Sequence, residues 1–157
     1  RSVRAVPVLA EMITFELDWK STMPGGLHRS PIEFYPAAQA LDRIGGSRLV
    51  GTMLAKIRAA SDEKTLKLCT WVLNRQLGKG YMALAAVDRK SQVTSFSTKE
   101  KENLLKASEF MKTECRLDYP PEYRALLEQI YKQAEEDRKK RQAEGKDGKE
   151  TDEKEAK

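Results

Sequence analysis

The stretch SRLVGTMLAKIRAASDEKTLKLCTWVLNRQLG, residues 47–78, predicts two helices joined by a short polar turn. Apolar residues recur every three or four positions in each half, which is typical of a helix with one face turned toward a core. Ser47 is expected to cap the first helix, and Ser61 with Asp62 to end it and begin the second. Gly78 is expected to end the second helix. The predicted buried residues are Leu49, Val50, Met53, Leu54 and Ile57, then Leu66, Cys69, Val72, Leu73 and Leu77.

Helical spacing continues on both sides of this pair. Residues 36–44 predict a short helix stopped by Gly45 and Gly46, and residues 81–90 predict a further one. Ser97 and Glu100 stand at capping-box spacing and open a helix over 97–116. Its predicted buried residues are Leu104, Leu105, Met111 and Cys115.

The two ends of the chain are less regular. Residues 7–20 fit a helix, although the alternation of Phe15, Leu17 and Trp19 with polar neighbours is a strand signal. We favour the helix because no second strand is evident to pair with it. Pro121 begins a last helix, and beyond Glu135 the apolar spacing gives way to mixed charge. The predicted buried face of this last helix is Tyr123, Leu126, Leu127, Ile130, Tyr131 and Ala134.

These segments predict an all-α protein with about seven helices in an antiparallel helical-hairpin array. The helix starts at Ser61 and Ser97 lie 36 residues apart, which is typical of stacked helix pairs. A plain helix bundle with short loops gives similar spacing and stays open as an alternative. We expect three regions. They are an N-terminal helix and loop over 1–35 that contacts a partner, a helical-hairpin domain over 36–134, and a charged helix extension with a disordered tail over 135–157.

Composition excludes several classes of protein. The chain has 157 residues, of which 39% are hydrophobic and 34% charged, and the mean hydropathy is −0.66. No apolar run approaches the roughly 20 residues that cross a bilayer, so we expect no membrane insertion. Cys69 and Cys115 are too few for a disulfide framework and are expected to be buried thiols in a reducing compartment. The chain begins at Arg1, which fits either a removed targeting peptide or a chosen boundary.

No constellation of residues predicts catalysis, a cofactor or a metal. Ser61 and Lys64 have the Ser-x-x-Lys spacing of some acyl-transfer enzymes, but the companion motifs are missing. His28 is the only histidine, which argues against a His-based metal site or nucleophile relay. We therefore expect a protein that is not an enzyme by itself.

The net charge of +5 and a pI near 9.2 indicate a mildly basic surface. Basic residues populate the predicted exposed faces of the central helices and are interleaved with acidic ones. They fit a helix face that is simply solvated, and if they bind a partner, the pattern favours an acidic protein surface over a nucleic acid. Trp19, near the end of the first segment, and His28 beside Arg29 in a Gly/Pro loop are further candidate contacts. The candidate partner-binding residues are Trp19, His28, Arg29, Arg43, Arg48, Arg58 and Arg75.

The segments TMLAKIRAA (52–60) and LKLCTWVL (66–73) resemble a pentatricopeptide-type helical hairpin, and residues 81–116 resemble a second, looser copy. Proteins of that family read RNA with paired side chains at repeated positions, and no such pair is recognisable here. The size, basic pI and hairpin array also resemble the accessory subunits of mitochondrial F-type ATP synthase catalytic heads. This resemblance implies a noncatalytic matrix subunit held on a larger, nucleotide-binding subunit. An RNA-binding helical-repeat or mitochondrial ribosomal protein is the alternative.

Overall fold

The structure, a computed structural model, describes residues 2–18, 30–77, 89–90, 93 and 95–152, and the side chains of these residues up to 142. The chain divides into two compact units, Arg1–Asp118 and Tyr119–Lys157. The predictions for Trp19, His28, Arg29 and residues 81–88 lie outside the described residues.

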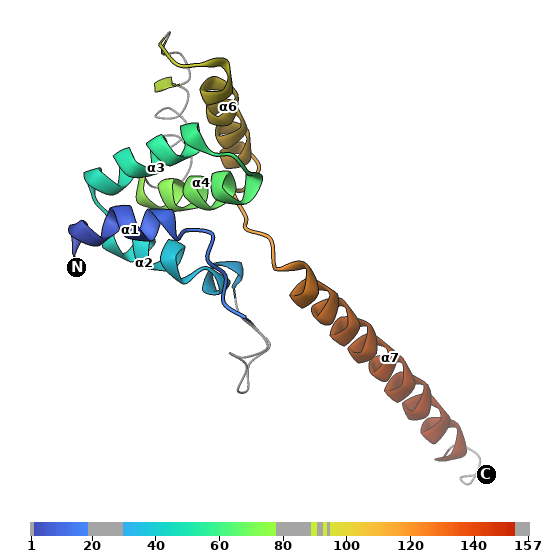
Figure 1. The fold of residues 1–157 in the computed structure, drawn as a ribbon. Coiled ribbons are helices and arrows are strands. Elements are labelled where there is room, and N and C mark those ends of the chain that lie inside the picture. The colour runs from blue at the N-terminus through green and yellow to red at the C-terminus, as the bar shows by residue number, and fades with distance from the viewer. Residues whose placement is uncertain (1, 19–29, 78–88, 91–92, 94, 153–157) are drawn as a thin grey trace. The chain divides into compact units, whose positions relative to one another are not determined.

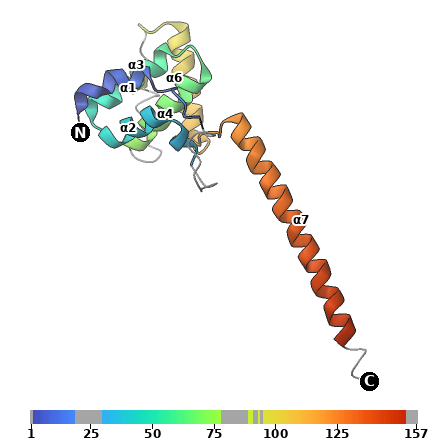
Figure 2. The same cartoon turned by 60° about the horizontal axis from the view of Figure 1, so that its bottom comes forward.

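The described residues contain α-helices, short 3-10 turns and no strand, which confirms the all-α class (Figures 1 and 2). The count among them is six α-helices, not seven, because the predicted helix over 81–90 lies almost entirely outside the described part. The 3-10 segments are η1 (Val3–Ala5) and η2 (Pro31–Phe34). The α-helices are α1 (Val6–Glu11), α2 (Pro36–Ile44), α3 (Ser47–Ala59), α4 (Glu63–Leu77), α6 (Thr98–Lys112) and α7 (Pro121–Asp152).

The core of the first unit lies where α3 packs against α4 and α6, with α1 and α2 completing it on the other side (Figure 1). Each helix contributes apolar residues three or four positions apart, so that one face of each is removed from water. Among the fully buried side chains are Leu41, Leu49, Met53, Ile57, Leu68, Val72, Leu73 and Leu104. The sequence pattern therefore identified most of this core.

Two helix starts are fixed by side chains that accept backbone hydrogen bonds. Asp62 accepts the backbone N–H of Thr65 at 2.7 Å and its hydroxyl at 2.8 Å, just ahead of α4. Ser97 and Glu100 form the predicted capping box at the start of α6. Ser47, by contrast, is not a cap: it is the first residue of α3, and Gly46 occupies the cap position. Gly45 and Gly46 have φ angles of 70° and 92°, so the turn between α2 and α3 is made by backbone that glycine adopts readily.

The N-terminal helix is shorter than the sequence predicted. α1 ends at Glu11, and residues 15–18 are not helical. The backbone N–H of Leu17 donates to the carbonyl of Phe34 at 2.8 Å, so this part of the chain bonds to η2 instead of continuing a helix. The strand-like alternation of Phe15 and Leu17 thus marked non-helical backbone, although no sheet forms among the described residues.

The predicted helix over 97–116 also ends early, at Lys112. Glu114 and Cys115 have φ angles of 69° and 50°, a left-handed conformation that ends the helix. The N–H of Cys115 then donates to the carbonyl of Phe110 at 3.2 Å. Leu105, predicted to be buried, is 57% exposed.

The second unit contains one long helix, α7, which runs through the charged residues beyond Glu135 without a break. Lys139 pairs with Glu135 at 2.8 Å, one turn earlier, as expected for a helix whose charged side chains face water. Tyr131 and Ala134 were predicted to be buried and are exposed, because the apolar face ends before them. The predicted region boundaries at 35/36 and 134/135 stay predictions. No helix in the described part of the chain has both the length and the apolar character needed to cross a membrane.

Candidate functional site

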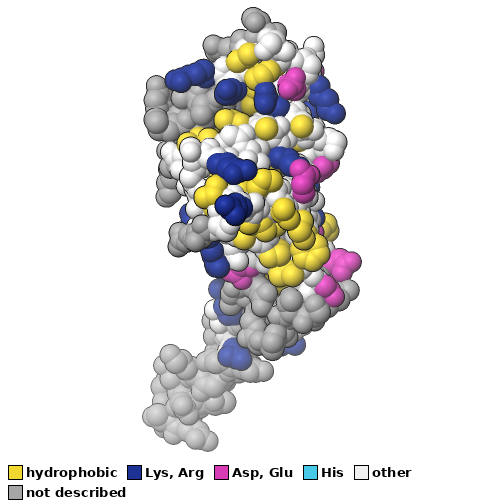
Figure 3. Space-filling view, turned by 60° about the vertical axis from the view of Figure 1, so that its left-hand side comes forward, with side chains coloured by type: hydrophobic (Ala, Val, Ile, Leu, Met, Phe, Trp, Pro, Cys, Tyr) yellow, Lys and Arg dark blue, Asp and Glu magenta, His cyan; other side chains and the backbone are white. Residues whose placement is uncertain are grey.

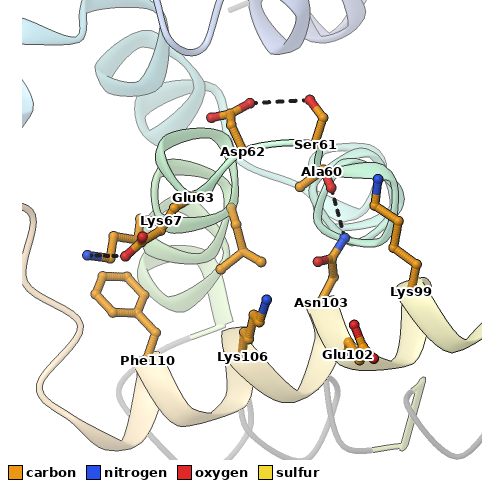
Figure 4. Close-up of a pocket in the computed structure, with 11 residues that line it drawn as sticks. Ala60, Ser61, Asp62, Glu63, Lys67, Lys99, Glu102, Asn103, Lys106 and Phe110 are labelled. Carbon is orange, nitrogen blue, oxygen red and sulfur yellow. Dashed lines mark hydrogen bonds and ion pairs between the residues drawn. The ribbon is translucent and has the colours of Figure 1, made fainter.

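A pocket of about 450 Å³ lies between the start of α4 and the face of α6, and we call it the α4–α6 pocket (Figure 4). The turn between α3 and α4 forms one wall, and residues spaced along α6 form the other. Its lining residues are Ala60, Ser61, Asp62, Glu63, Leu66, Lys67, Lys99, Glu102, Asn103, Lys106 and Phe110.

Asn103 anchors this pocket from within α6. Its side chain is only 7% exposed, and its amide donates to the carbonyls of Arg58 at 2.9 Å and Ala60 at 3.0 Å. Figure 4 shows the second of these bonds reaching from α6 to the end of α3. A buried amide that satisfies two backbone carbonyls holds the turn at a fixed distance from α6.

The charged groups on the α4 side of the pocket are stabilised in their ionised forms. Hydrogen bonds from the backbone and then the side chain of Thr65 lower the pKa of Asp62. The Lys67 ammonium, 2.8 Å from the Glu63 carboxylate, lowers the pKa of Glu63 by hydrogen bonding and charge, while Glu63 raises the pKa of Lys67. A general acid or base works best with a pKa near the working pH, and all three shifts lead away from neutrality. These groups suit electrostatic contact better than proton transfer.

Ser61 and Lys64 do not meet as a nucleophile and its base. The Ser61 hydroxyl donates to the Asp62 carboxylate at 3.5 Å. Lys64 lies 2.5 Å from Glu16 and 4.9 Å from the centre of the Tyr35 ring, so its ammonium serves contacts with the N-terminal segment. Within the described residues, no three His, Cys, Asp or Glu side chains lie close enough to hold a metal ion.

Both cysteines are buried free thiols in the described structure. Burial raises the pKa of Cys69 to about 12, and burial alone raises the pKa of Cys115 to about 12. A thiol of that pKa is almost entirely protonated at neutral pH and reacts slowly. Their predicted role as small buried hydrophobic residues is confirmed.

The described arginines among the predicted partner-binding residues fall into two groups. Arg43 and Arg48 are exposed on α2 and α3. Arg58 lies 3.9 Å from Glu100 and 4.4 Å from the centre of the Phe96 ring. Arg75 lies 3.5 Å from Asp42 and 5.6 Å from the centre of the Trp71 ring. The structure therefore does not gather the four arginines into one site, and two of them have contacts within the fold.

Other cations of the central helices also have acidic neighbours. Lys56 pairs with Glu11 at 2.5 Å, and Lys67 lies 3.6 Å from Asp118 in addition to its pair with Glu63. The basic character that the sequence shows on these faces is thus partly neutralised by residues far away in the chain.

Sequence reasoning missed an exposed apolar surface on the N-terminal segment. Val8 and Met12, within the predicted helix over 7–20, are 62% and 48% exposed. Val6, Ala10 and Ile13 face the core instead. The signal was available: Val6, Ala10 and Ile13 also have helical spacing, and only one of the two possible faces could be buried. Asn103 was missed as well, because an isolated asparagine in a polar stretch carries no pattern.

No family model matches the chain, and neither a curated protein nor a solved structure does.

Proposed function

We propose that this chain is a noncatalytic structural subunit that binds a larger protein within a multiprotein complex. The observation that carries the proposal is the contrast between its paired cations and its exposed apolar side chains. A cluster of large hydrophobic residues that remains in water on a folded domain commonly marks a protein-binding surface, whereas single exposed ones are ordinary. Among the described residues, four exposed large hydrophobic side chains belong to the N-terminal segment, namely Val3, Val8, Met12 and Phe15.

The pairing of the cations favours a protein partner over RNA. A phosphate-binding track needs basic side chains free to replace counterions. Lys56, Lys64 and Lys67 each have a carboxylate within 2.8 Å, and Arg75 has one within 3.5 Å.

The finer form of the proposal rests on the resemblances drawn from the sequence. We propose a degenerate pentatricopeptide-like array of antiparallel helical hairpins in the mitochondrial matrix. Its host would be the catalytic head of an F-type ATP synthase, as for the extra eighteen-kilodalton subunit of the euglenozoan enzyme. The partner would then be a nucleotide-binding subunit contacted on its outer surface. Buried apolar area with complementary charge at the rim would hold the two together.

The test is native purification of a tagged chain from mitochondria at moderate salt. We expect it to co-migrate with ATP synthase head subunits in near-stoichiometric amount. Elution alone near its own mass of 17.8 kDa would contradict the proposal.

The RNA-binding alternative makes a different prediction. It requires a gel shift of single-stranded RNA at low ionic strength that weakens steeply as salt is added. Such a shift, without co-migrating protein subunits, would replace the proposed function with that alternative.

A further inference from the structure

The α4–α6 pocket contains an amide oxygen that the fold does not use. Asn103 is 7% exposed, and both of its hydrogen bonds come from the amide nitrogen, to the carbonyls of Arg58 and Ala60. Its oxygen accepts no hydrogen bond from the described residues. Figure 4 shows this oxygen turned away from Ala60 and toward Lys106, into the pocket. An amide oxygen can accept two hydrogen bonds, so this one is available to an N–H or O–H group that enters the pocket.

The same face of α6 carries a lysine on each side of Asn103. Lys99 lies four residues before it and Lys106 three residues after it, so the three side chains share one face of the helix. Both lysines are exposed, and neither forms an ion pair within the described part of the chain. Lys and Arg side chains are also scattered among hydrophobic ones elsewhere, as Figure 3 shows for one face of the molecule. The two lysines of the pocket differ from these because a buried hydrogen-bond acceptor lies between them.

The carboxylates of the pocket have fewer charges to offer than the lining suggests. Glu63 is paired with Lys67 at 2.8 Å, so these two charges offset each other. Asp62 accepts two hydrogen bonds from Thr65 as the cap of α4. Glu102 is exposed on α6 and has no ion-pair partner among the described residues. The two unpaired lysines therefore exceed the unpaired carboxylate of Glu102 by one positive charge, which a ligand with a single carboxylate would balance.

One end of the pocket is apolar. Leu66 of α4 and Phe110 of α6 line it, and the Phe110 side chain is only half-buried. The Lys67 ammonium lies 5.9 Å from the centre of the Phe110 ring. An apolar side chain placed over this ring would remove hydrophobic surface of both partners from water.

The spacing along α6 matches that of an extended peptide. Lys106 and Phe110 are one helical turn apart, which is about 6 Å along the helix. Side chains two residues apart in an extended chain lie on the same side, about 6.7 Å from each other. An acidic residue and an apolar residue separated by one residue can therefore face Lys106 and Phe110 together. The backbone of such a segment also supplies the N–H that the Asn103 oxygen lacks.

We propose that the α4–α6 pocket binds a short extended segment of the partner protein in which an acidic residue and an apolar residue are separated by one residue. A backbone N–H donates to Asn103, the carboxylate lies against Lys106, and the apolar side chain covers Phe110. RNA fits less well, because a phosphate at every nucleotide would also meet the carboxylates of the pocket. The inference rests on the proposed function, since it names the kind of segment through which the partner is recognised.

The probe is a fluorescent peptide of about seven residues, capped at both ends, with glutamate and leucine separated by one alanine. One twin carries glutamine in place of the glutamate, and a series of twins is N-methylated at one backbone nitrogen at a time. Fluorescence anisotropy with the full chain is expected to show binding of the parent peptide. The glutamine twin and at least one N-methylated twin should bind ~3-fold or more weakly, since one loses the charge and the other the donor.

Two protein variants locate the peptide while Asn103 stays in place. Lys106→Gln should weaken binding of the parent peptide ~3-fold or more and leave binding of the glutamine twin unchanged, because the lysine and the glutamate act on each other. Lys112→Gln, at an exposed lysine of α6 outside the pocket lining, is the matched control and should change neither. Circular dichroism checks that both variants fold.

Several outcomes would overturn the inference. Equal loss of both peptides in Lys106→Gln, or no loss, places the peptide elsewhere. Binding of a twin with a free carboxyl terminus but not of the capped parent assigns the pocket to a chain end. Displacement of the parent peptide by single-stranded RNA, with RNA binding lost in Lys106→Gln, assigns the pocket to RNA.

Native purification separates this inference from the proposed function. Release of the partner from Lys106→Gln at lower salt than from Lys112→Gln supports the inference. Release of the partner at the same salt from both variants defeats the inference and leaves the proposed function standing. Absence of any partner from wild type defeats the proposed function, whereas binding of the peptide is measured without the partner.

Discussion

α4 and the N-terminal segment around α1 differ in how far their apolar side chains are buried. α4 has fifteen residues, and its apolar positions Leu66, Leu68 and Leu73 are buried. α1 has six residues and buries Val6 and Ala10, yet Val8 and Met12 beside them stay in water. The fold buries most of the apolar residues of α4, and Trp71 and Leu77 are half-buried. It buries only part of those in the N-terminal segment, and the remainder stays exposed.

The largest expected effect tests the first half of this comparison. Leu73→Ala should lower the free energy of unfolding by about 2–5 kcal/mol, because it opens a cavity at a fully buried position where α4 meets its neighbours. Val8→Ala, the matched change on α1, should alter it by no more than about 0.5 kcal/mol. Urea unfolding followed by circular dichroism measures both. Similar losses for the two variants would mean that α1 is as deeply packed as α4.

The next effect concerns the contact that positions the start of α4. Asn103→Ala removes the amide that bonds to the carbonyls of Arg58 and Ala60. We expect a loss of about 1–3 kcal/mol, since buried carbonyls are left without a donor. Thermal unfolding gives the measurement. The comparison variant is Asn74→Ala on α4, because the buried side-chain oxygen of Asn74 accepts no hydrogen bond from the residues that the structure describes. A change within error would show that water replaces the amide.

The cap of α4 should have a smaller, pH-dependent effect. Asp62→Ala is expected to cost about 0.5–2 kcal/mol at neutral pH. The pKa of Asp62 in the folded protein is lower than the ordinary carboxyl pKa of 3.8. The ionised cap therefore adds to the free energy of unfolding at any pH above 3.8. This stabilisation is lost as the pH falls through the pKa of Asp62 in the folded protein. The difference between wild type and variant, followed from neutral to acid pH, should therefore shrink below about pH 4. A difference that grows on acidification would contradict this assignment.

The smallest expected effect is an increase in stability. Gly51→Ala should raise the free energy of unfolding by about 0.5–1 kcal/mol, because α3 is helical at Gly51 and an added Cβ meets open space. Urea unfolding measures it. A loss instead of a gain would mean that Gly51 serves the packing of this chain.

Periodicity predicted the parts of the fold in which a single helical face could be buried. Leu49, Met53 and Ile57 have only one plausible face, and the structure buries all three. In the N-terminal segment two sets of residues have helical spacing, and the structure buries Val6 and Ala10 while Val8 and Met12 stay exposed. Which face wins depends on the neighbouring helices, and no local pattern contains them.

The candidate site was less predictable than the core. Arg58 and Arg75 were expected to be available for a partner, but Glu100 and Asp42 lie within 3.9 Å and 3.5 Å of them. These acids are more than thirty residues away in the chain, so their proximity is a product of helix packing. The ion pair between Lys56 and Glu11 likewise joins residues more than forty positions apart.

The sequence alone determined that this chain is helical and where α2, α4 and the start of α6 lie, since local spacing, prolines, glycines and capping side chains act within a few residues. Tertiary structure decided which face of α1 enters the core, where that helix ends, and which cations have acidic partners. Those outcomes depend on energies between segments distant in the chain, namely the burial of one apolar face at the expense of another and the attraction of charges brought together by packing.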